Sequence, residues 1–229
     1  MAKKPKQPQH DSLEGIESAL TRTEQFIEDN SKIISYVVLG AILIVLLYLG
    51  FNRLYLKPLE EEASGQMFMA EKFFERDSFN LALNGYGTYP GFLQINEDYG
   101  MTKAANLSNY YAGICYLQLG DYENAIDYLE DFDTEDLLIG SAKYSSLGDA
   151  YVELGDYDRA VKSFKKGIDD YTNDFSTPIL LKKAGLSYEE AGEYENAIEV
   201  YEQIKTEFPD ATEARDIDKY IARARRQVG

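Results

Sequence analysis

The sequence predicts an all-α protein with one N-terminal transmembrane helix, a solenoid of about four helix hairpins, and a C-terminal capping helix. Three observations lead to this prediction. A long run near the N-terminus has no charge, one motif returns three times in phase after it, and a charged segment behind a proline ends the chain. The predicted parts are a tail with an amphipathic helix, the span, the repeats and the cap: residues 1–32, 33–51, 60–209 and 210–229.

The first part combines a polar tail with an apolar stripe. Residues 1–10 contain three lysines and two prolines, a composition typical of disorder. Asp11 can cap a helix, with Glu14 at the capping-box position. Apolar positions then recur at alternating steps of three and four, at Leu13, Ile16, Leu20, Thr23 and Ile27. This pattern resembles a coiled coil, but two heptads do not establish a dimer, and an amphipathic helix lying against the membrane explains it equally well.

The second part is the run from Ile33 to Phe51, nineteen residues without a charge. A helix of this length crosses the roughly 30 Å hydrocarbon core of a bilayer. A helix buried in a soluble protein would show a polar stripe, and this run has none. A cleaved signal peptide is usually shorter, nearer the N-terminus and followed by small residues, whereas Phe51 is followed by Asn52 and Arg53. We therefore expect an uncleaved membrane anchor.

Charge divides unevenly across the predicted span. Residues 52–229 carry 18 Lys and Arg against 34 Asp and Glu, which leaves −16 of the chain's formal net charge of −17. Nucleic acid is not expected as a partner, because binding it begins with neutralising phosphates. Lys3, Lys4 and Lys6 favour a cytoplasmic N-terminus, with the repeats on the other side of the membrane. The single Cys115 permits no internal disulfide.

The repeats share one frame that begins at Gly113, Gly148 and Gly185, so it returns after 35 and then 37 residues. Each copy reads Gly, a tyrosine three positions later, Gly-Asp-Tyr or Gly-Glu-Tyr, and then an alanine. The first glycine allows a paired helix to approach closely, and the second suits a left-handed turn between two helices. Such a hairpin cannot bury its apolar face alone, so neighbouring copies must stack.

This motif resembles the tetratricopeptide repeat, a helix hairpin about 34 residues long. A degenerate fourth copy precedes the three, with Ala70, Phe73, Phe79, Ala82 and Tyr86 in the same frame. The extra residues between this copy and Gly113 fall in two segments that are typical of a loop, 85–91 and 96–100. At the other end, Pro209 closes the last repeat, as it does in the family. Residues 210–228 should form the capping helix.

The sequence offers no catalytic constellation, so we do not expect an enzyme, and we expect no cofactor or metal. His10 is the one histidine of the chain, which leaves Cys115 and every serine without a histidine base in the predicted domain. Residues 131–135 start like a calcium loop, but Asp136 stands where that loop needs glycine and Ala142 where it needs glutamate. A solvated charged turn is the better interpretation.

The resemblance also implies a binding site, because the family reads its ligands along the concave side of the first helices. Carried onto this frame, the implied groove residues are Phe74, Leu107, Tyr110, Ile114, Leu117, Asp149, Val152, Glu153, Lys182, Leu186 and Glu189. An apolar strip flanked by carboxylates suits an extended, apolar or basic polypeptide. Alternatively, part of the strip packs on the extra segment or on the membrane-proximal helix.

In architecture, the chain is similar to the ancillary subunits of the bacterial SecYEG translocon (YfgM-type). That resemblance implies a single-pass inner-membrane protein whose repeats are periplasmic. Its partners would be translocon subunits, emerging or unfolded polypeptide, and a periplasmic chaperone. A structural scaffold in a cell-envelope assembly or secretion complex is the alternative, and cytosolic repeats would instead indicate a receptor or docking role.

Overall fold

The computed structural model describes residues 26–229 except Glu28, and the chain forms two units, residues 1–57 and 58–229. The tail and nearly all of the apolar stripe predicted for residues 11–27 therefore lie outside the described residues. In the first unit, helix α2 runs from Ser31 to Phe51, and a π-helical turn, η1, follows from Asn52 to Leu56. None of the α2 side chains is buried, and the helix is long and apolar enough to cross a membrane.

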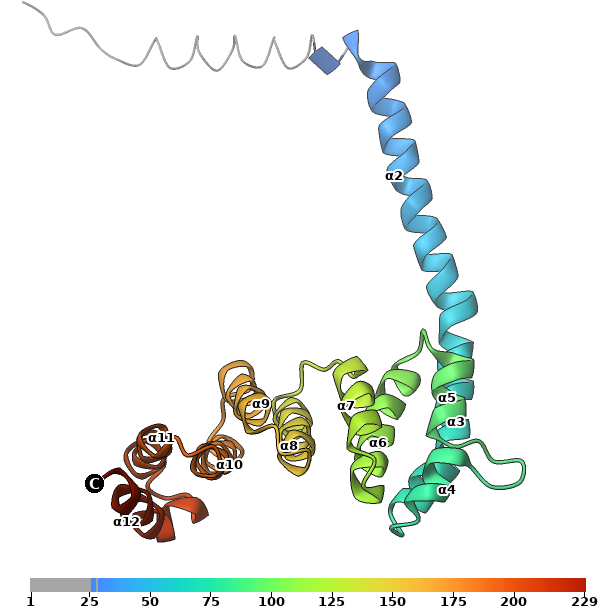
Figure 1. The fold of residues 1–229 in the computed structure, drawn as a ribbon. Helices are drawn as coiled ribbons and strands as arrows, with labels where there is room; N and C mark the ends of the chain where they lie inside the picture. Colours follow the sequence, from blue (N-terminus) through green and yellow to red (C-terminus); the bar gives the residue numbers. More distant parts are fainter. Residues whose placement is uncertain (1–25, 28) are drawn as a thin grey trace, which may run out of the picture. The chain divides into compact units, whose positions relative to one another are not determined.

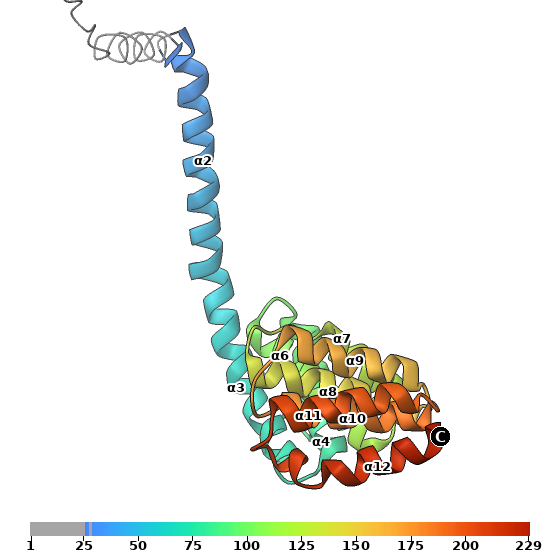
Figure 2. The ribbon, with the colours of Figure 1, turned by 90° about the vertical axis from the view of Figure 1, so that its left-hand side faces the viewer.

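The second unit consists of helices joined by short turns (Figure 1). Its elements are α3 (Lys57–Phe74), α4 (Phe79–Asn84), α5 (Phe92–Tyr99), α6 (Lys103–Leu119), α7 (Tyr122–Asp131), α8 (Leu137–Glu153), α9 (Tyr157–Asp170), α10 (Thr177–Glu190), α11 (Tyr194–Glu207), η2 (Thr212–Asp216) and α12 (Ile217–Val228). The three regular repeats are the hairpins α6–α7, α8–α9 and α10–α11. Each hairpin packs against the next, and α12 packs against α11 (Figure 2). The all-helical solenoid predicted from the sequence is confirmed.

In each of the three regular hairpins, a glycine of the first helix makes the same close contact with a large side chain of the second helix. A Cβ atom placed on Gly113 would lie 2.5 Å from Leu129, and one on Gly148 would lie 2.2 Å from the Phe164 ring. Gly185 repeats this contact with the Tyr201 ring at 2.2 Å. The first helix of each hairpin therefore approaches the second so closely that only glycine fits. The repeat alanines of the second helices, Ala125, Ala160 and Ala197, are fully buried as predicted.

The turns between paired helices are also repeated. Gly120, Gly155 and Gly192 all have positive φ angles, of 81°, 73° and 78°. The next residue is the N-cap of the second helix. The Asp121 and Asp156 side chains each accept a hydrogen bond from a backbone N–H of the first turn, whereas Glu193 makes no such bond. A short carboxylate reaches the free N–H groups at a helix start, and a glutamate at the same position does not.

The core follows the solenoid as three successive clusters. The first is centred on Phe92 and Ile95, the second on Leu129 and Phe164, and the third on Tyr201. Each cluster takes residues from adjoining hairpins, so no hairpin has a core of its own. This is the packing expected of a repeat protein whose units depend on their neighbours.

The extra segment before the regular repeats differs from the expected loop. Residues 85–91 do form one, but Phe92–Tyr99 form helix α5, so the loop predicted for residues 96–100 is wrong for most of its length. Phe92 and Ile95 are fully buried, and the Phe92 ring stacks on Tyr111 at 4.8 Å between centroids. These buried contacts hold a helix that is too short to be stable by itself.

The C-terminal segment covers the open end of the stack. After Pro209, the 3-10 turn η2 leads into α12, which turns Ile217, Ile221 and Ala224 towards the third cluster. The outer side of α12 is charged, so this helix presents a polar face beyond the last repeat.

Candidate protein-binding groove

A depression of about 280 Å³ lies between the C-terminal halves of α6 and α8. Its lining consists of Leu117, Gln118, Tyr122, Asp149, Val152 and Glu153. Four of these, Leu117, Asp149, Val152 and Glu153, belong to the groove implied by the repeat resemblance. The structure thus brings the central part of the implied groove together in one hollow.

The apolar strip of α6 borders this hollow and is only half exposed. Tyr110, Ile114 and Leu117 pack against the second core cluster, and the Tyr110 ring lies 5.2 Å from the Phe132 ring. Burial raises the pKa of the Tyr110 hydroxyl, and Tyr111 beside it raises that pKa further. Much of the apolar strip therefore stabilises the stack itself.

The polar side of the hollow is organised by two contacts. The Lys183 ammonium lies 2.6 Å and 2.9 Å from the two carboxylate oxygens of Asp149, and 2.7 Å from Ser145 Oγ. The Tyr122 hydroxyl donates to Glu153 Oε2 at 3.3 Å. Loss of water around that hydroxyl, and then the charge of Glu153, raise the pKa of Tyr122. The hollow therefore contains two carboxylates in different states. Lys183 balances the charge of Asp149, whereas Glu153 accepts a hydrogen bond from the neutral Tyr122 hydroxyl.

Two implied groove residues lie with the first core cluster. Phe74 contacts the Tyr111 ring at 4.9 Å in a T-shaped arrangement and the Phe79 ring at 5.7 Å. Leu107 packs against the same cluster. Their side chains fill the joint between α6 and the first hairpin, which α3 and α4 form.

The implied residues of α10 face the C-terminal helix. The Lys182 ammonium lies 4.8 Å from the centre of the Tyr220 ring. Glu189 accepts two hydrogen bonds from the Arg223 guanidinium, both at 2.7 Å, and one from the Tyr201 hydroxyl at 2.7 Å. Leu186 remains exposed. Of the three, Leu186 is the one that is most open to a ligand, and a binding role for the eleven implied residues stays a prediction.

Sequence reasoning missed two residues that shape the hollow. Tyr122 belongs to the Gly-Asp-Tyr motif at the turn of its repeat, and the motif does not indicate that its hydroxyl reaches Glu153 of α8. Lys183 follows Lys182 in α10. The two side chains point in different directions from the helix, and it is Lys183 that reaches Asp149 of α8. Lys183 can be related to Asp149 only when it is known that α10 packs beside α8.

The one cysteine of the chain is inert in this setting. Cys115 is fully buried in the first cluster, and burial raises the pKa of its thiol to about 12. At neutral pH such a thiol is almost entirely protonated, so it is neither a nucleophile nor a ready metal ligand.

Comparisons with known proteins agree with the repeat geometry. Two family models described as tetratricopeptide repeat match residues 108–135 and 146–212. No curated protein matches the sequence. Among solved structures, the kinesin light chain nearly identical TPR-like repeats of Podosopora anserina share 16% identity over 74% of this chain and 88% of that chain, with a TM-score of 0.55. The MamA protein shares 18% identity over 73% of this chain and 92% of that chain, with a TM-score of 0.53. These likenesses concern the fold, and together with the family models they support tetratricopeptide repeats in this chain, an architecture that typically binds other proteins.

Proposed function

We propose that the chain is a membrane-anchored protein-binding module, an ancillary or chaperone-like subunit at the periplasmic side of the SecYEG translocon. The observation that carries the proposal is helix α2, whose residues 33–51 carry no charge, before a repeat domain with a hollow that combines Leu117 and Val152 with carboxylates. An anchor followed by a binding domain is an arrangement that holds a protein-binding surface close to a membrane. The sequence resemblance to translocon subunits supplies the location.

The topological part of this proposal places residues 33–51 in the bacterial inner membrane as a single span, with a cytoplasmic N-terminus. The three N-terminal lysines support this orientation. Protease added to spheroplasts should digest the repeats and leave a short membrane-protected N-terminal fragment. Full protection of residues 60–229 would reverse the orientation and replace the translocon role with a cytosolic docking role.

The binding part of the proposal uses the hollow as one contact point for an extended polypeptide. Leu117 and Val152 would cover an apolar side chain of the ligand, and each well-buried apolar side chain contributes about 1.5–3 kcal/mol before ordering costs. Glu153 would meet a basic side chain. Exposed Leu186 would extend the contact towards the last repeat.

A crosslinking experiment in intact cells tests this part. A photo-reactive amino acid at Gln118 lies in the hollow, on an exposed side chain whose replacement leaves the core intact. The matched control carries the same group at Glu199, an exposed position of α11 outside the hollow. The proposal expects translocon subunits or emerging chains to be captured from Gln118 and not from Glu199. Equal capture from both positions would refute a groove-specific role.

A structural scaffold in a cell-envelope assembly or secretion complex is the second candidate. The observation that favours it is the engagement of Tyr110 and Ile114 in the second cluster, which leaves a shallow hollow in place of a long open groove. A shallow site suits a fixed contact with a folded partner. Recovery of stoichiometric envelope proteins, without translocon subunits, from mild detergent extracts would favour the scaffold.

A further inference from the structure

A second cavity, of about 350 Å³, lies on the side of α8 that faces away from the hollow. Successive residues of a helix are turned by about 100°, so Tyr144, Leu147 and Tyr151 line this cavity while Asp149 and Val152 point to the opposite side. The cavity is closed by the end of α7 and by α9. The residues that line it are Glu130, Lys143, Tyr144, Leu147, Tyr151, Arg159, Lys162, Ser163 and Lys166.

This cavity, called here the basic pocket, has a charge opposite to that of its domain. Four of its lining side chains are cations, Lys143, Arg159, Lys162 and Lys166, and one is a carboxylate, Glu130. The rest of the domain is strongly acidic. Cations held close together repel one another, and a bound anion offsets that repulsion.

The cations are held in place by the pocket walls. The Arg159 guanidinium lies 4.7 Å from the centre of the Tyr151 ring, and the Lys166 ammonium lies 5.5 Å from that of Tyr144. Lys143 is buried, and its ammonium donates to the backbone carbonyls of Glu130 and Phe132. Aromatic faces and carbonyls orient a cation without cancelling its full charge.

Carboxylates neutralise only part of this charge. Arg159 pairs with Asp156 at 2.5 Å, and Lys166 pairs with Asp170 at 2.7 Å, both outside the lining. Lys162 forms no ion pair with any residue that the structure describes. Burial lowers the pKa of Lys143, the charges of Asp133 and Glu130 oppose that effect, and the charge of Lys166 lowers the pKa further. Mutual repulsion between the lysines is what a bound anion would relieve.

We propose that the basic pocket binds the carboxylate side chains of a short acidic segment in a partner protein. The walls offer several N–H donors around a small volume, and hydrogen bonds between ions of opposite charge are the strong ones. This surface is separate from the hollow, so the chain could hold two proteins at once, whichever partner the hollow binds.

A long polyanion fits this site poorly. Asp156 and Asp170 pair with pocket cations at its margin, and Asp158 and Asp169 are further carboxylates of α9. Charges within about 8 Å still interact at physiological salt. A nucleic acid carries a charge at every phosphate and would meet these carboxylates, whereas an acidic segment of a protein can place uncharged residues beside them.

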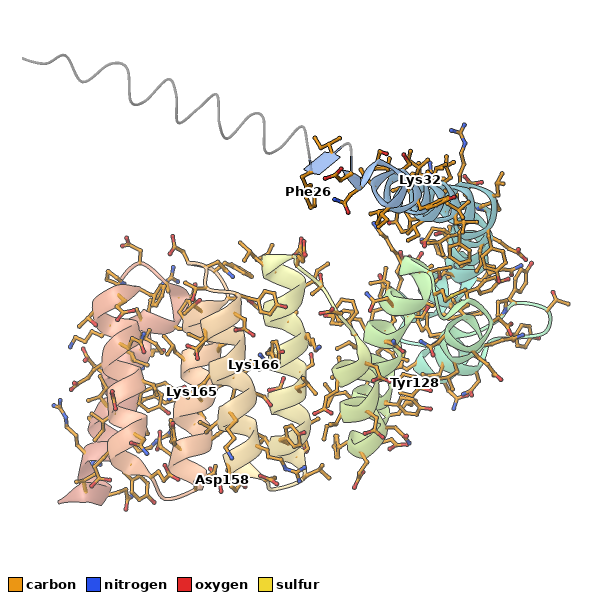
Figure 3. The ribbon with its side chains drawn as sticks, turned by 90° about the horizontal axis from the view of Figure 1, so that it is seen from above. Phe26, Lys32, Tyr128, Asp158, Lys165 and Lys166 are labelled. Atoms are coloured by element: carbon orange, nitrogen blue, oxygen red, sulfur yellow. The ribbon has the colours of Figure 1, made fainter. Side chains whose placement is uncertain are left out.

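The test uses the full chain in micelles of a non-ionic detergent, at low ionic strength, with fluorescence anisotropy as the readout. The probe is a fluorescein-labelled decapeptide of alternating Glu and Ala, and the matched probe has Gln in place of Glu. The variant Lys162→Glu/Lys166→Glu reverses two exposed pocket charges. The control variant Lys165→Glu alters the residue next to Lys166 on α9 (Figure 3), which does not line the basic pocket.

We expect the Glu peptide to bind, the Gln peptide not to bind, and the double variant to weaken binding by at least about tenfold. Lys165→Glu should weaken it by no more than about threefold, the effect of an exposed charge at the margin. Equal binding of the two peptides, or equal losses in the double variant and the control, would overturn the proposal. Tighter binding of a thymidine oligonucleotide than of the Glu peptide would overturn the assignment to carboxylates. Circular dichroism of each variant separates loss of binding from loss of fold.

Discussion

The first hairpin and the three regular hairpins reach the same fold by different packing. In the regular repeats, a glycine of the first helix lies against one large side chain of the second, as Gly148 does against Phe164. In the first hairpin, α3 and α4 have no such glycine contact, and an aromatic group of Phe74, Phe79, Phe92 and Tyr111 fills the joint. The solenoid thus tolerates an irregular unit when an added helix supplies the missing buried surface.

This difference predicts which kind of substitution should destabilise each region. The regular repeats depend on a lack of volume at their glycines, so adding atoms should damage them. The first hairpin depends on large rings, so removing atoms should damage it. Substitutions of the two kinds therefore distinguish the two modes of packing.

The largest effect is expected from Phe92→Ala. This ring is fully buried between the first hairpin and α6, and removing a buried aromatic ring costs about 3–5 kcal/mol of unfolding free energy. Urea unfolding measures the loss. Phe175→Ala is the matched control, because Phe175 is 72% exposed and its truncation should change stability by less than about 0.5 kcal/mol.

The same variant should also expose Cys115, which belongs to the first cluster. Its modification by a thiol reagent should be slow in the native chain and faster in Phe92→Ala, since opening of the cluster must precede the reaction. An unchanged rate would mean that α5 is peripheral to the cluster.

A smaller effect is expected from adding one carbon to a glycine. Gly148→Ala places a Cβ atom 2.2 Å from the Phe164 ring, and overpacking of this kind costs about 1–3 kcal/mol. Gly65→Ala in α3 has nothing within 4 Å of the new atom, so relief of glycine's backbone entropy should stabilise the domain by about 0.5–1 kcal/mol. Thermal unfolding should therefore show a lower melting temperature for Gly148→Ala and a higher one for Gly65→Ala. Shifts in the same direction would contradict the comparison.

The smallest effect concerns the turns of the regular repeats. Glu193 is the N-cap residue of α11 and makes no side-chain capping bond, whereas Asp156, the N-cap residue of α9, makes one. Glu193→Asp should stabilise the domain by about 0.5–1 kcal/mol, and Asp156→Glu should destabilise it by a similar amount. Chemical denaturation of the two variants provides the measurement. A loss of stability in Glu193→Asp would mean that the hydrogen bond from Asn196 to Glu193 matters more than the cap.

The regular part of the fold could be predicted from the sequence because its glycines, alanines and tyrosines recur in register. Helix α5 could not, because Gly91 and Asn96 suggest a loop, and the burial of Phe92 and Ile95 that stabilises the helix is a tertiary effect. The candidate groove was predicted in part. Leu117 and Val152 follow from the repeat resemblance carried onto this frame, but the contact between Asp149 and Lys183 depends on how two separate hairpins pair.

Helix α12 has a consequence for how many copies of the chain can join. Its apolar side covers Tyr201 and Ile204, and its Arg223 closes over Glu189. Without this helix, the last hairpin would end in an unpaired apolar surface of the kind that each repeat already offers to the next. Another copy could then continue the stack head to tail, and such a contact generates open filaments because it does not close on itself. The charged outer side of α12 therefore acts as a terminator that keeps the array at a fixed length.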